Sequence, residues 1–265
     1  MLTRAQAGAV RRRTAMRQYR RVAPAFVPLP ATGRTFSSQR PVRLSDMDAR
    51  GRLRLDAVAR YLQDVAIDDV AETGWGAPEH LWVVRRYEVR VLSAFLEDSR
   101  VDLTTWCSGL AALAAGRRTS LVGDAGGHIE VESVWIHLGP DARPARISGF
   151  GVYTEATEGR PVSTRLELPD PPADAERTDW QLRASDVDRM GHLNNAIHWQ
   201  AIEDRLLGAE IDPQRPFHAV LEYRGSIDLG DEVELARFAQ DGGAALAFLV
   251  GGRTQAVAWV EQPRP

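Results

Sequence analysis

The chain contains one stretch twice, and this repeat limits its fold more than any other feature of the sequence. RLSDMDARGRLRLDAVARYLQD (43–64) recurs as RASDVDRMGHLNNAIHWQAIED (183–204), at a constant offset of 140 residues. A period of this length is far too long for a solenoid of short repeats, so it predicts a duplicated domain. Seven positions are identical in the two copies: Arg43/Arg183, Ser45/Ser185, Asp46/Asp186, Asp48/Asp188, Gly51/Gly191, Leu53/Leu193 and Asp64/Asp204.

Composition narrows the class of protein. The 265 residues are 44% hydrophobic, which is enough core for two small domains or one large domain. The formal net charge of −3 gives no basic signature for nucleic acid. Cys107 is the only cysteine, which excludes an intramolecular disulfide framework and thiolate zinc sites and favours a cytoplasmic location. No stretch approaches the length of a transmembrane helix, so no membrane span is expected.

The first residues differ from the rest of the chain. Residues 1–40 contain nine arginines and no acidic residue. We interpret residues 1–35 as a basic, disordered N-terminal arm; a targeting peptide is the alternative, because transit segments are rich in arginine and poor in acids.

The remaining chain divides into two similar units, each with a strand, a helix and about four antiparallel strands. A polar, proline-containing linker is expected at 155–179. This order predicts a duplicated α+β domain in which a curved sheet wraps a helix. The periodicity predicts helices at 56–70 and 194–207, and strands at 35–44, 81–92, 101–106, 117–122, 129–138, 180–184, 219–227, 232–240, 244–251 and 254–261.

The two copies differ where chemistry would take place. The first has Arg52, Arg54 and Leu55 where the second has His192, Asn194 and Asn195. A polar cluster at a helix N-terminus can polarise a carbonyl, because free N–H groups and the positive end of the helix dipole lie there. The alternative is structural: one asparagine caps the helix and the acids favour its N-terminus.

Seven motifs, in order along the chain, resemble one family. They are LWVVRR (81–86), DLTTWCSG (102–109), GRRTSL (116–121), SVW (133–135), RPARI (143–147), SDVDRMGHLNN (185–195) and LEYR (221–224). The chain is similar to acyl-acyl carrier protein (acyl-ACP) thioesterases, whose plant members end fatty-acid synthesis. The resemblance implies a double hotdog at 36–154 and 180–262, two tandem domains forming a pseudo-dimer within one chain. It also implies hydrolysis of fatty acyl-ACP or acyl-CoA by a monomer or homodimer.

The resemblance transfers the catalytic residues only in part. The family's loop is similar to D-x-N-x-H-x-N-N, which places its aspartate on Asp188 and its histidine on His192. The catalytic asparagine between them falls on Met190, and the glutamate and cysteine that follow the LEYR motif fall on Ser226 and Ile227. A non-catalytic acyl-binding or regulatory protein is therefore the alternative function.

Thioester hydrolysis assigns a role to each candidate. We expect Asp188 to act as general base or nucleophile, His192 to orient the water or the carboxylate, and Asn194 to hold the water. The backbone N–H groups from Gly191 to Leu193 are expected to stabilise the oxyanion, and Asn195 to cap the helix. Asp48 should only close its turn, because an arginine stands at the equivalent of His192.

The expected substrate contacts lie mainly in the first half. Arg85, Arg86, Arg117 and Arg118 are candidates for meeting acyl carrier protein or the phosphates of CoA. No metal or other cofactor is expected, because the histidines have no ligand spacing. The expected acyl tunnel is lined mainly by Val58, Leu62, Val65 and Ile67 of the first helix and by strand residues near Trp82 and Trp106.

Overall fold

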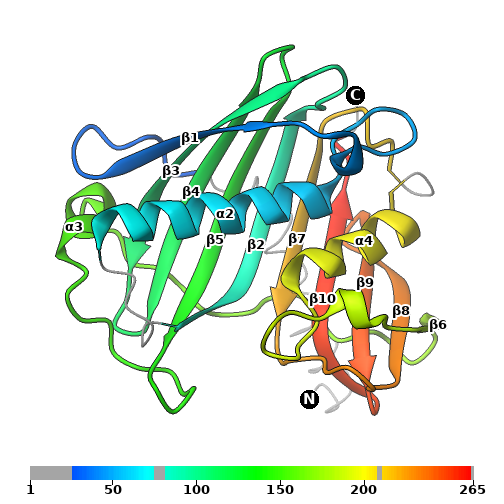
Figure 1. Ribbon diagram of the computed structural model, residues 1–265. Helices are drawn as coiled ribbons and strands as arrows, with labels where there is room; N and C mark the ends of the chain where they lie inside the picture. Colours follow the sequence, from blue (N-terminus) through cyan, green and yellow to red (C-terminus); the bar gives the residue numbers. More distant parts are fainter. Residues whose placement is uncertain (1–25, 75–80, 208–210, 264–265) are drawn as a thin grey trace, which may run out of the picture.

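The computed structural model describes residues 26–74, 81–207 and 211–263, and Figure 1 shows their arrangement. Most of the predicted basic arm, residues 1–25, lies outside this range. The strands are β1 (Thr35–Pro41), β2 (Leu81–Ser93), β3 (Arg100–Leu110), β4 (Ala114–Gly123), β5 (His128–Leu138), β6 (Glu176–Trp180), β7 (Phe217–Tyr223), β8 (Val233–Gln240), β9 (Gly243–Val250) and β10 (Arg253–Glu261). The helices are α2 (Leu55–Thr73), α3 (Gly151–Thr154) and α4 (Asn195–Arg205), with 3-10 turns η1 (Leu44–Asp46), η2 (Glu155–Thr157) and η3 (Ala184–Asp186).

All ten strands form one antiparallel sheet, in the order β1-β3-β4-β5-β2-β7-β10-β9-β8-β6. The order of equivalent strands is the same when it is followed inward from either edge, and the halves join where β2 pairs with β7, from Arg86↔Glu222 to Val91↔Phe217. Both α2 and α4 lie on the same face of the sheet (Figure 1). The double hotdog that the resemblance implied is therefore confirmed, and the sheets of its two units are joined into one.

Local sequence explains most element boundaries. The helix α2 ends at Gly74, whose φ of 69° is a left-handed conformation that glycine adopts without steric cost. The prediction of a strand at 180–184 is wrong: β6 ends at Trp180, whose ring packs on Phe248 with 5.6 Å between centroids. The following residues form the turn η3, because the carboxylate of Asp186 accepts the backbone N–H of Arg183 at 2.9 Å.

The outer face of the sheet, opposite the helices, is covered in part by the linker. Leu168 is buried there against apolar side chains of the second half. Glu222, fully buried on β7, accepts the backbone N–H groups of Glu167 at 2.8 Å and Leu168 at 3.0 Å. Burial raises the pKa of Glu222, and these two hydrogen bonds oppose the rise. Glu222 therefore fastens the linker.

The residues that precede β1 also contact the outer face. The guanidinium of Arg118 lies 4.0 Å from the ring centroid of Phe26 and donates to the carbonyl oxygen of Val27 at 3.2 Å. Part of the predicted arm therefore packs against the sheet. Among the described helices, none is long and apolar enough to cross a membrane.

Candidate active site

Asp188 builds the turn that precedes α4. Its Oδ1 accepts the backbone N–H of Met190 at 2.8 Å and that of His192 at 3.4 Å. Gly191, with φ of 81°, donates its N–H to the carbonyl oxygen of Asp188 at 3.0 Å. Asp48 makes the same turn in the first copy, where its Oδ1 accepts two backbone N–H groups at 2.8 and 2.9 Å. One oxygen of each aspartate is thus committed to the turn, and only the other oxygen can differ in role.

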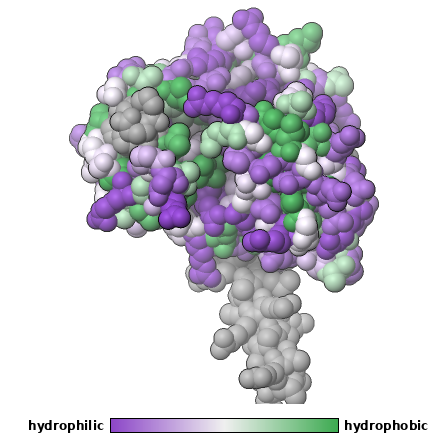
Figure 2. Space-filling view, turned by 60° about the horizontal axis from the view of Figure 1, so that its bottom comes forward, coloured by the Kyte–Doolittle hydropathy of each residue, from purple (hydrophilic) through white to green (hydrophobic). Residues whose placement is uncertain are grey.

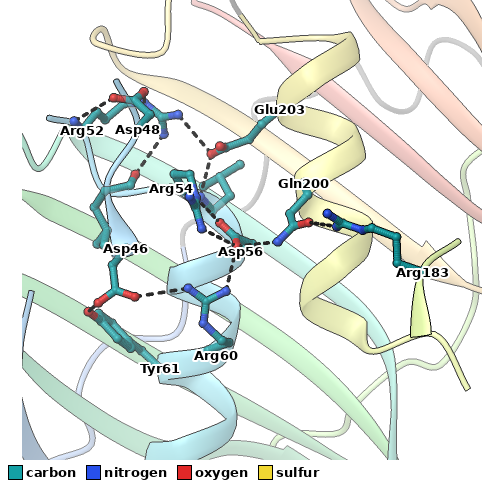
Figure 3. A network of polar contacts seen from close by, with 12 residues as sticks. Asp46, Asp48, Arg52, Arg54, Asp56, Arg60, Tyr61, Arg183, Gln200 and Glu203 are labelled. Atoms are coloured by element: carbon teal, nitrogen blue, oxygen red, sulfur yellow. Dashed lines mark hydrogen bonds and ion pairs between the residues drawn. The ribbon is translucent and has the colours of Figure 1, made fainter. Parts of the chain in front are cut away.

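In the first copy the helix N-terminus is closed by charged side chains (Figure 3). Arg52 donates its Nε to Oδ2 of Asp48 at 3.1 Å and its Nη2 to Oε1 of Glu203, on α4, at 3.1 Å. The same Glu203 oxygen accepts the backbone N–H of Leu55, the first residue of α2, at 2.6 Å. A carboxylate oxygen therefore accepts the first backbone N–H of the helix, at the end where anions are favoured.

A second group of charges surrounds Asp56, in the first turn of α2. Its buried carboxylate accepts from Arg54 at 2.8 Å, from Arg60 at 2.7 Å and from Gln200 of α4 at 3.0 Å (Figure 3). Burial alone would raise the pKa of Asp56, but these hydrogen bonds outweigh it and lower the pKa to about 2. The first copy therefore holds a paired anion, and the helices are linked across the junction of the two halves.

The equivalent positions in the second copy are open. Asn195 begins α4 as Leu55 begins α2, and its backbone N–H has no hydrogen-bond partner within the described residues. The residue equivalent to Glu203 is the uncharged Gln63. Oδ2 of Asp188 likewise has no partner within the described part of the chain, because His192 replaces the arginine that binds Asp48. One free donor, on Asn195, and one free acceptor, on Asp188, therefore remain in the turn and first residue of this helix.

His192 has an acidic partner that the sequence reasoning missed. Its Nδ1 lies 2.6 Å from Oδ1 of Asp228, in the loop after β7, and both side chains are partly exposed. A carboxylate only accepts hydrogen bonds, so Nδ1 carries the hydrogen and Nε2 of the neutral ring is an acceptor. The backbone pairing that places Asp228 is the bond from Leu193 N–H to the Ile227 carbonyl oxygen, at 2.7 Å.

Two of the expected roles at this turn are corrected. Asn194, not Asn195, caps α4, since its Oδ1 accepts the backbone N–H of Ala196 at 2.9 Å. The backbone N–H groups of Gly191, His192 and Leu193, expected to stabilise an oxyanion, all donate within the turn or to the neighbouring loop. At the first residue of α4, the N–H of Asn195 is available as a backbone donor within the described part of the chain.

The residues at which this chain departs from the family's catalytic pattern are either exposed or buried in the core. Met190 contributes its backbone N–H to the turn, while its side chain is half exposed. Ser226 is exposed and Ile227 is buried in the core. The carboxylate nearest in sequence that contacts the site is Asp228, two residues after Ser226, which pairs with His192.

Two of the four arginines expected to meet a carrier protein, Arg117 and Arg118, are largely buried and paired with carboxylates. Arg117 faces α2 and donates to Asp69 at 2.7 Å. Arg118 faces the opposite side of the sheet, is 3% exposed and pairs with Glu130 and Glu132. Arg85 is half-buried and donates to the carbonyl oxygen of Tyr223 at 2.8 Å. Adjacent strand residues point to opposite faces, and both faces are covered at Arg117 and Arg118, so the charges of these two residues are paired within the protein.

The expected acyl-tunnel residues separate into two groups. Val58, Leu62 and Val65 are buried between α2 and the sheet, and Trp82 lies partly buried beside Phe150 near α3. Ile67 is 66% exposed, and Trp106 lies on the outer face near Arg118, so neither can line a space beneath α2. In the described residues no group of three or more His, Cys, Asp or Glu could hold a metal ion.

The fold and the site define a double hotdog protein with one closed and one open helix N-terminus. Models of the acyl-ACP thioesterase N-terminal and C-terminal domains match residues 33–148 and 170–249. The chain belongs to the acyl-ACP thioesterase family and is a thioesterase.

Individual relatives agree with this assignment over nearly the whole chain. An uncharacterized protein of Mycobacterium tuberculosis is 30% identical over 92% of this chain and 98% of its own length. The structure of a 12:0-ACP thioesterase from Umbellularia californica is 17% identical, with a TM-score of 0.69 over 88% of this chain and 99% of that one. An acyl-ACP thioesterase from Bacteroides thetaiotaomicron is also 17% identical, with a TM-score of 0.68 over 85% of this chain and 96% of that one. These two structures share the fold.

Proposed function

We propose that the protein hydrolyses the thioester of fatty acyl-ACP, or of acyl-CoA, to the free fatty acid at the N-terminus of α4. One observation carries the proposal. In the first copy the N–H that begins the helix holds a carboxylate oxygen of Glu203 at 2.6 Å, and in the second copy the equivalent N–H of Asn195 has no partner within the described residues. A negatively charged oxygen fits the first position, so the developing oxyanion fits the second.

The residues of the second turn supply the rest of the reaction. A water donates one hydrogen bond to Oδ2 of Asp188 and one to Nε2 of His192, which leaves its lone pair free to attack the thioester carbon. Asp188 takes the proton as the C–O bond forms, and the N–H of Asn195 donates to the carbonyl oxygen as it becomes negative. The C–S bond then breaks, and the thiolate takes the proton from Asp188.

The same arrangement accommodates the departures from the family pattern. A thiol leaves readily, because its pKa is about 8.5, so no strong general acid is required. Asp228 fixes the ring of His192 through Nδ1. The family's polar side chains at the positions of Met190 and Ser226 are absent here, and Asp228 provides positioning in their place. The reaction therefore uses Asp188 and His192, with Asp228 in support. Direct attack by the carboxylate, giving an anhydride, is the other use of the same oxygen.

The test is release of free fatty acid by the purified protein from acyl-ACP and acyl-CoA of 6 to 18 carbons. His192→Ala should lower kcat by about 10²-fold, the scale for losing a group that orients or activates water. His128→Ala is the matched control, because His128 is equally exposed at 40% and also pairs with a carboxylate, that of Glu130 at 2.8 Å. Acyl-ACP binding without release of fatty acid would favour the non-catalytic acyl-binding alternative.

A further inference from the structure

A row of polar side chains crosses the inner face of the first half, between α2 and the sheet. On β3 the inward residues are Leu103, Thr105 and Cys107, and on β4 they are Leu121, Thr119, Arg117 and Ala115. The residues before and after this row belong to two separate apolar clusters. We call the row the polar belt; it consists of Thr105, Thr119, Arg117, Ser133 and Asp69.

Hydrogen bonds connect the belt across three strands. Thr119 donates its hydroxyl to that of Thr105 at 3.0 Å, and Thr105 donates to the carbonyl oxygen of Arg118 at 2.7 Å. Nη1 of Arg117 donates to the hydroxyl of Thr105 at 3.2 Å. Ser133, on β5, donates to the carbonyl oxygen of Arg117 at 3.1 Å. The belt is therefore a satisfied network that an apolar group could enter only by leaving buried polar atoms unpaired.

Ion pairs fasten α2 to the sheet at the belt. The carboxylate of Asp69, 1% exposed, receives Arg117 from β4 at 2.7 Å and Arg34 from the segment before β1 at 2.7 Å. Tyr153 of α3 lies on the far side, with its ring centroid 5.8 Å from the guanidinium of Arg117. Removing one partner of a buried ion pair costs far more than separating a few apolar contacts. The helix can therefore lift from the sheet before Asp69 much more easily than at Asp69.

The apolar layer on the near side of the belt starts close to the open helix N-terminus. Glu203 of α4 contacts Leu55, the first residue of α2. In the repeat, Gln63 of α2 is equivalent to Glu203, and Asn195 is equivalent to Leu55. By this symmetry, Gln63 is the neighbour of Asn195. Beyond Gln63 the buried face of α2 presents Val65 and then Asp69. Beneath α4 the layer is filled by larger side chains, Trp199 and Phe248 among them. An acyl tail that starts at α4 therefore meets aliphatic side chains under α2 and then the belt.

We propose that the polar belt ends the acyl-binding space, so that the enzyme selects short and medium acyl chains and rejects long ones. The inference rests on the proposed hydrolysis at α4. From Gln63 to Asp69 the helix rises roughly 9 Å, at 1.5 Å per residue. A membrane acyl chain fills about 15 Å, half of the roughly 30 Å hydrocarbon core. A tail of that length would have to displace Asp69 and Arg117. A shorter tail would displace only Val65 and its apolar neighbours.

The experiment measures kcat/KM for acyl-ACP substrates from 6 to 18 carbons, with even chain lengths. In the wild type we expect a drop of about tenfold or more between two successive substrates, the scale on which an apolar pocket rejects added methylenes. In the double variant Asp69→Leu/Arg117→Met the drop should move to longer chains by at least one substrate. Both partners are replaced together, and Arg34 keeps Glu72, its other partner at 3.1 Å, so no buried charge is left unpaired.

The matched control is Asp68→Leu/Arg40→Met. This pair also joins α2 to a strand, but on the outside of the helix, where Asp68 is 45% exposed. Its chain-length profile should equal that of the wild type. If the belt variant does not fold, Asp69→Asn/Arg117→Gln removes the charges at nearly constant volume and should make the drop less steep.

The outcomes separate the inference from the function on which it rests. A wild-type profile without a drop up to 18 carbons, or an unchanged profile in a folded belt variant, would overturn the inference while leaving hydrolysis in place. No hydrolysis at any chain length would instead remove the proposed function.

Discussion

The turns before α2 and α4 have the same backbone hydrogen bonds, but charged side chains occupy the N-terminus of α2 and not that of α4. The N–H of Asp48 donates to the carbonyl oxygen of Arg52 at 2.8 Å, as that of Asp188 does to His192 at 2.8 Å. Around α2 the free positions are filled by Arg52 and Glu203, and around α4 they are empty of protein partners within the described residues. Duplication therefore preserved the geometry of the turn, and under the proposed function two charged side chains determine which copy can accept a substrate.

The two turns also explain why an aspartate is present in both copies. Asp48 and Asp188 are identical because each builds its turn with Oδ1. The aspartate is thus repeated because both turns need it, and under the proposed function the two copies differ in the partner of Oδ2. Figure 2 shows a mostly hydrophilic face on which apolar side chains gather around a recess near its middle.

The largest effect is expected from removing the carboxylate that closes the first copy. Glu203→Ala leaves the N–H of Leu55 without its acceptor and Arg52 with one partner fewer, so the free energy of unfolding should fall by about 3 kcal/mol. The matched control Gln63→Ala, at the equivalent place on α2, should change it by less than about 0.5 kcal/mol. Urea denaturation of both variants measures the difference. Equal losses would mean that the two helix ends are not differently filled.

The next effect separates the two aspartates by activity. Asp188→Asn keeps the Oδ1 acceptor of the turn and removes the base, so kcat for acyl-ACP should fall by about 10²-fold or more. Asp48→Asn should keep nearly full kcat and lower the melting temperature, because only its ion pair with Arg52 is weakened. Steady-state kinetics on folded protein provides the measurement. Similar kcat losses in the two variants would contradict a single open site.

A smaller effect concerns acid stability, because the first copy has Asp56 where the second has Ala196. The pKa of Asp56 is lowered from 3.8 to about 2 in the folded protein. Its contribution, about 2 kcal/mol at 1.36 kcal/mol per pKa unit, is fully present well above pH 3.8 and is lost as the pH falls through about 2. Asp56→Asn should therefore flatten the fall of stability between pH 4 and 2. An unchanged pH dependence in the variant would remove Asp56 from this role.

The smallest effect is expected at Asp228. Asp228→Asn weakens the positioning of the His192 ring, and kcat should fall by about tenfold, because the pair is partly exposed. The pH dependence of kcat should change as well, and Asp228→Glu should restore part of the activity. Asp231→Asn is the control, since Asp231 accepts the backbone N–H of Asp228 at 2.8 Å and braces only the loop. A normal pH profile in Asp228→Asn would argue against the positioning role.

The repeat was sufficient to predict a duplicated α+β domain, because apolar periodicity and turn residues are local signals that both copies carry, and the double hotdog followed from the resemblance to the family. The predicted helix at 56–70 agrees with the structure, where it lies within α2. The prediction of a strand at 180–184 was wrong, because Asp186 closes a turn with the backbone of Arg183. A side chain bonded to its own turn gives no periodic signal.

The site was predictable only where sequence neighbours form it. Asp188, His192 and Asn194 were predicted from one stretch of sequence; the structure makes Asn194 the helix cap, and the catalytic roles of Asp188 and His192 stay predictions. Asp228 reaches His192 only because the loop after β7 pairs with Leu193, which is a tertiary contact. The burial of Arg117 and Arg118 was missed because alternation predicts opposite faces but not what covers them.

The most direct test follows the two helix ends in one spectrum. A nonhydrolysable acyl-phosphopantetheine analogue, with an amide in place of the thioester, is added to 15N-labelled protein, and the backbone amide resonances of Asn195 and Leu55 are compared. We expect the Asn195 resonance to shift with saturation at one analogue per chain, while Leu55, which already donates to Glu203, does not move. A shift at Leu55 equal to that at Asn195, or saturation at two analogues per chain, would contradict a single open site at α4.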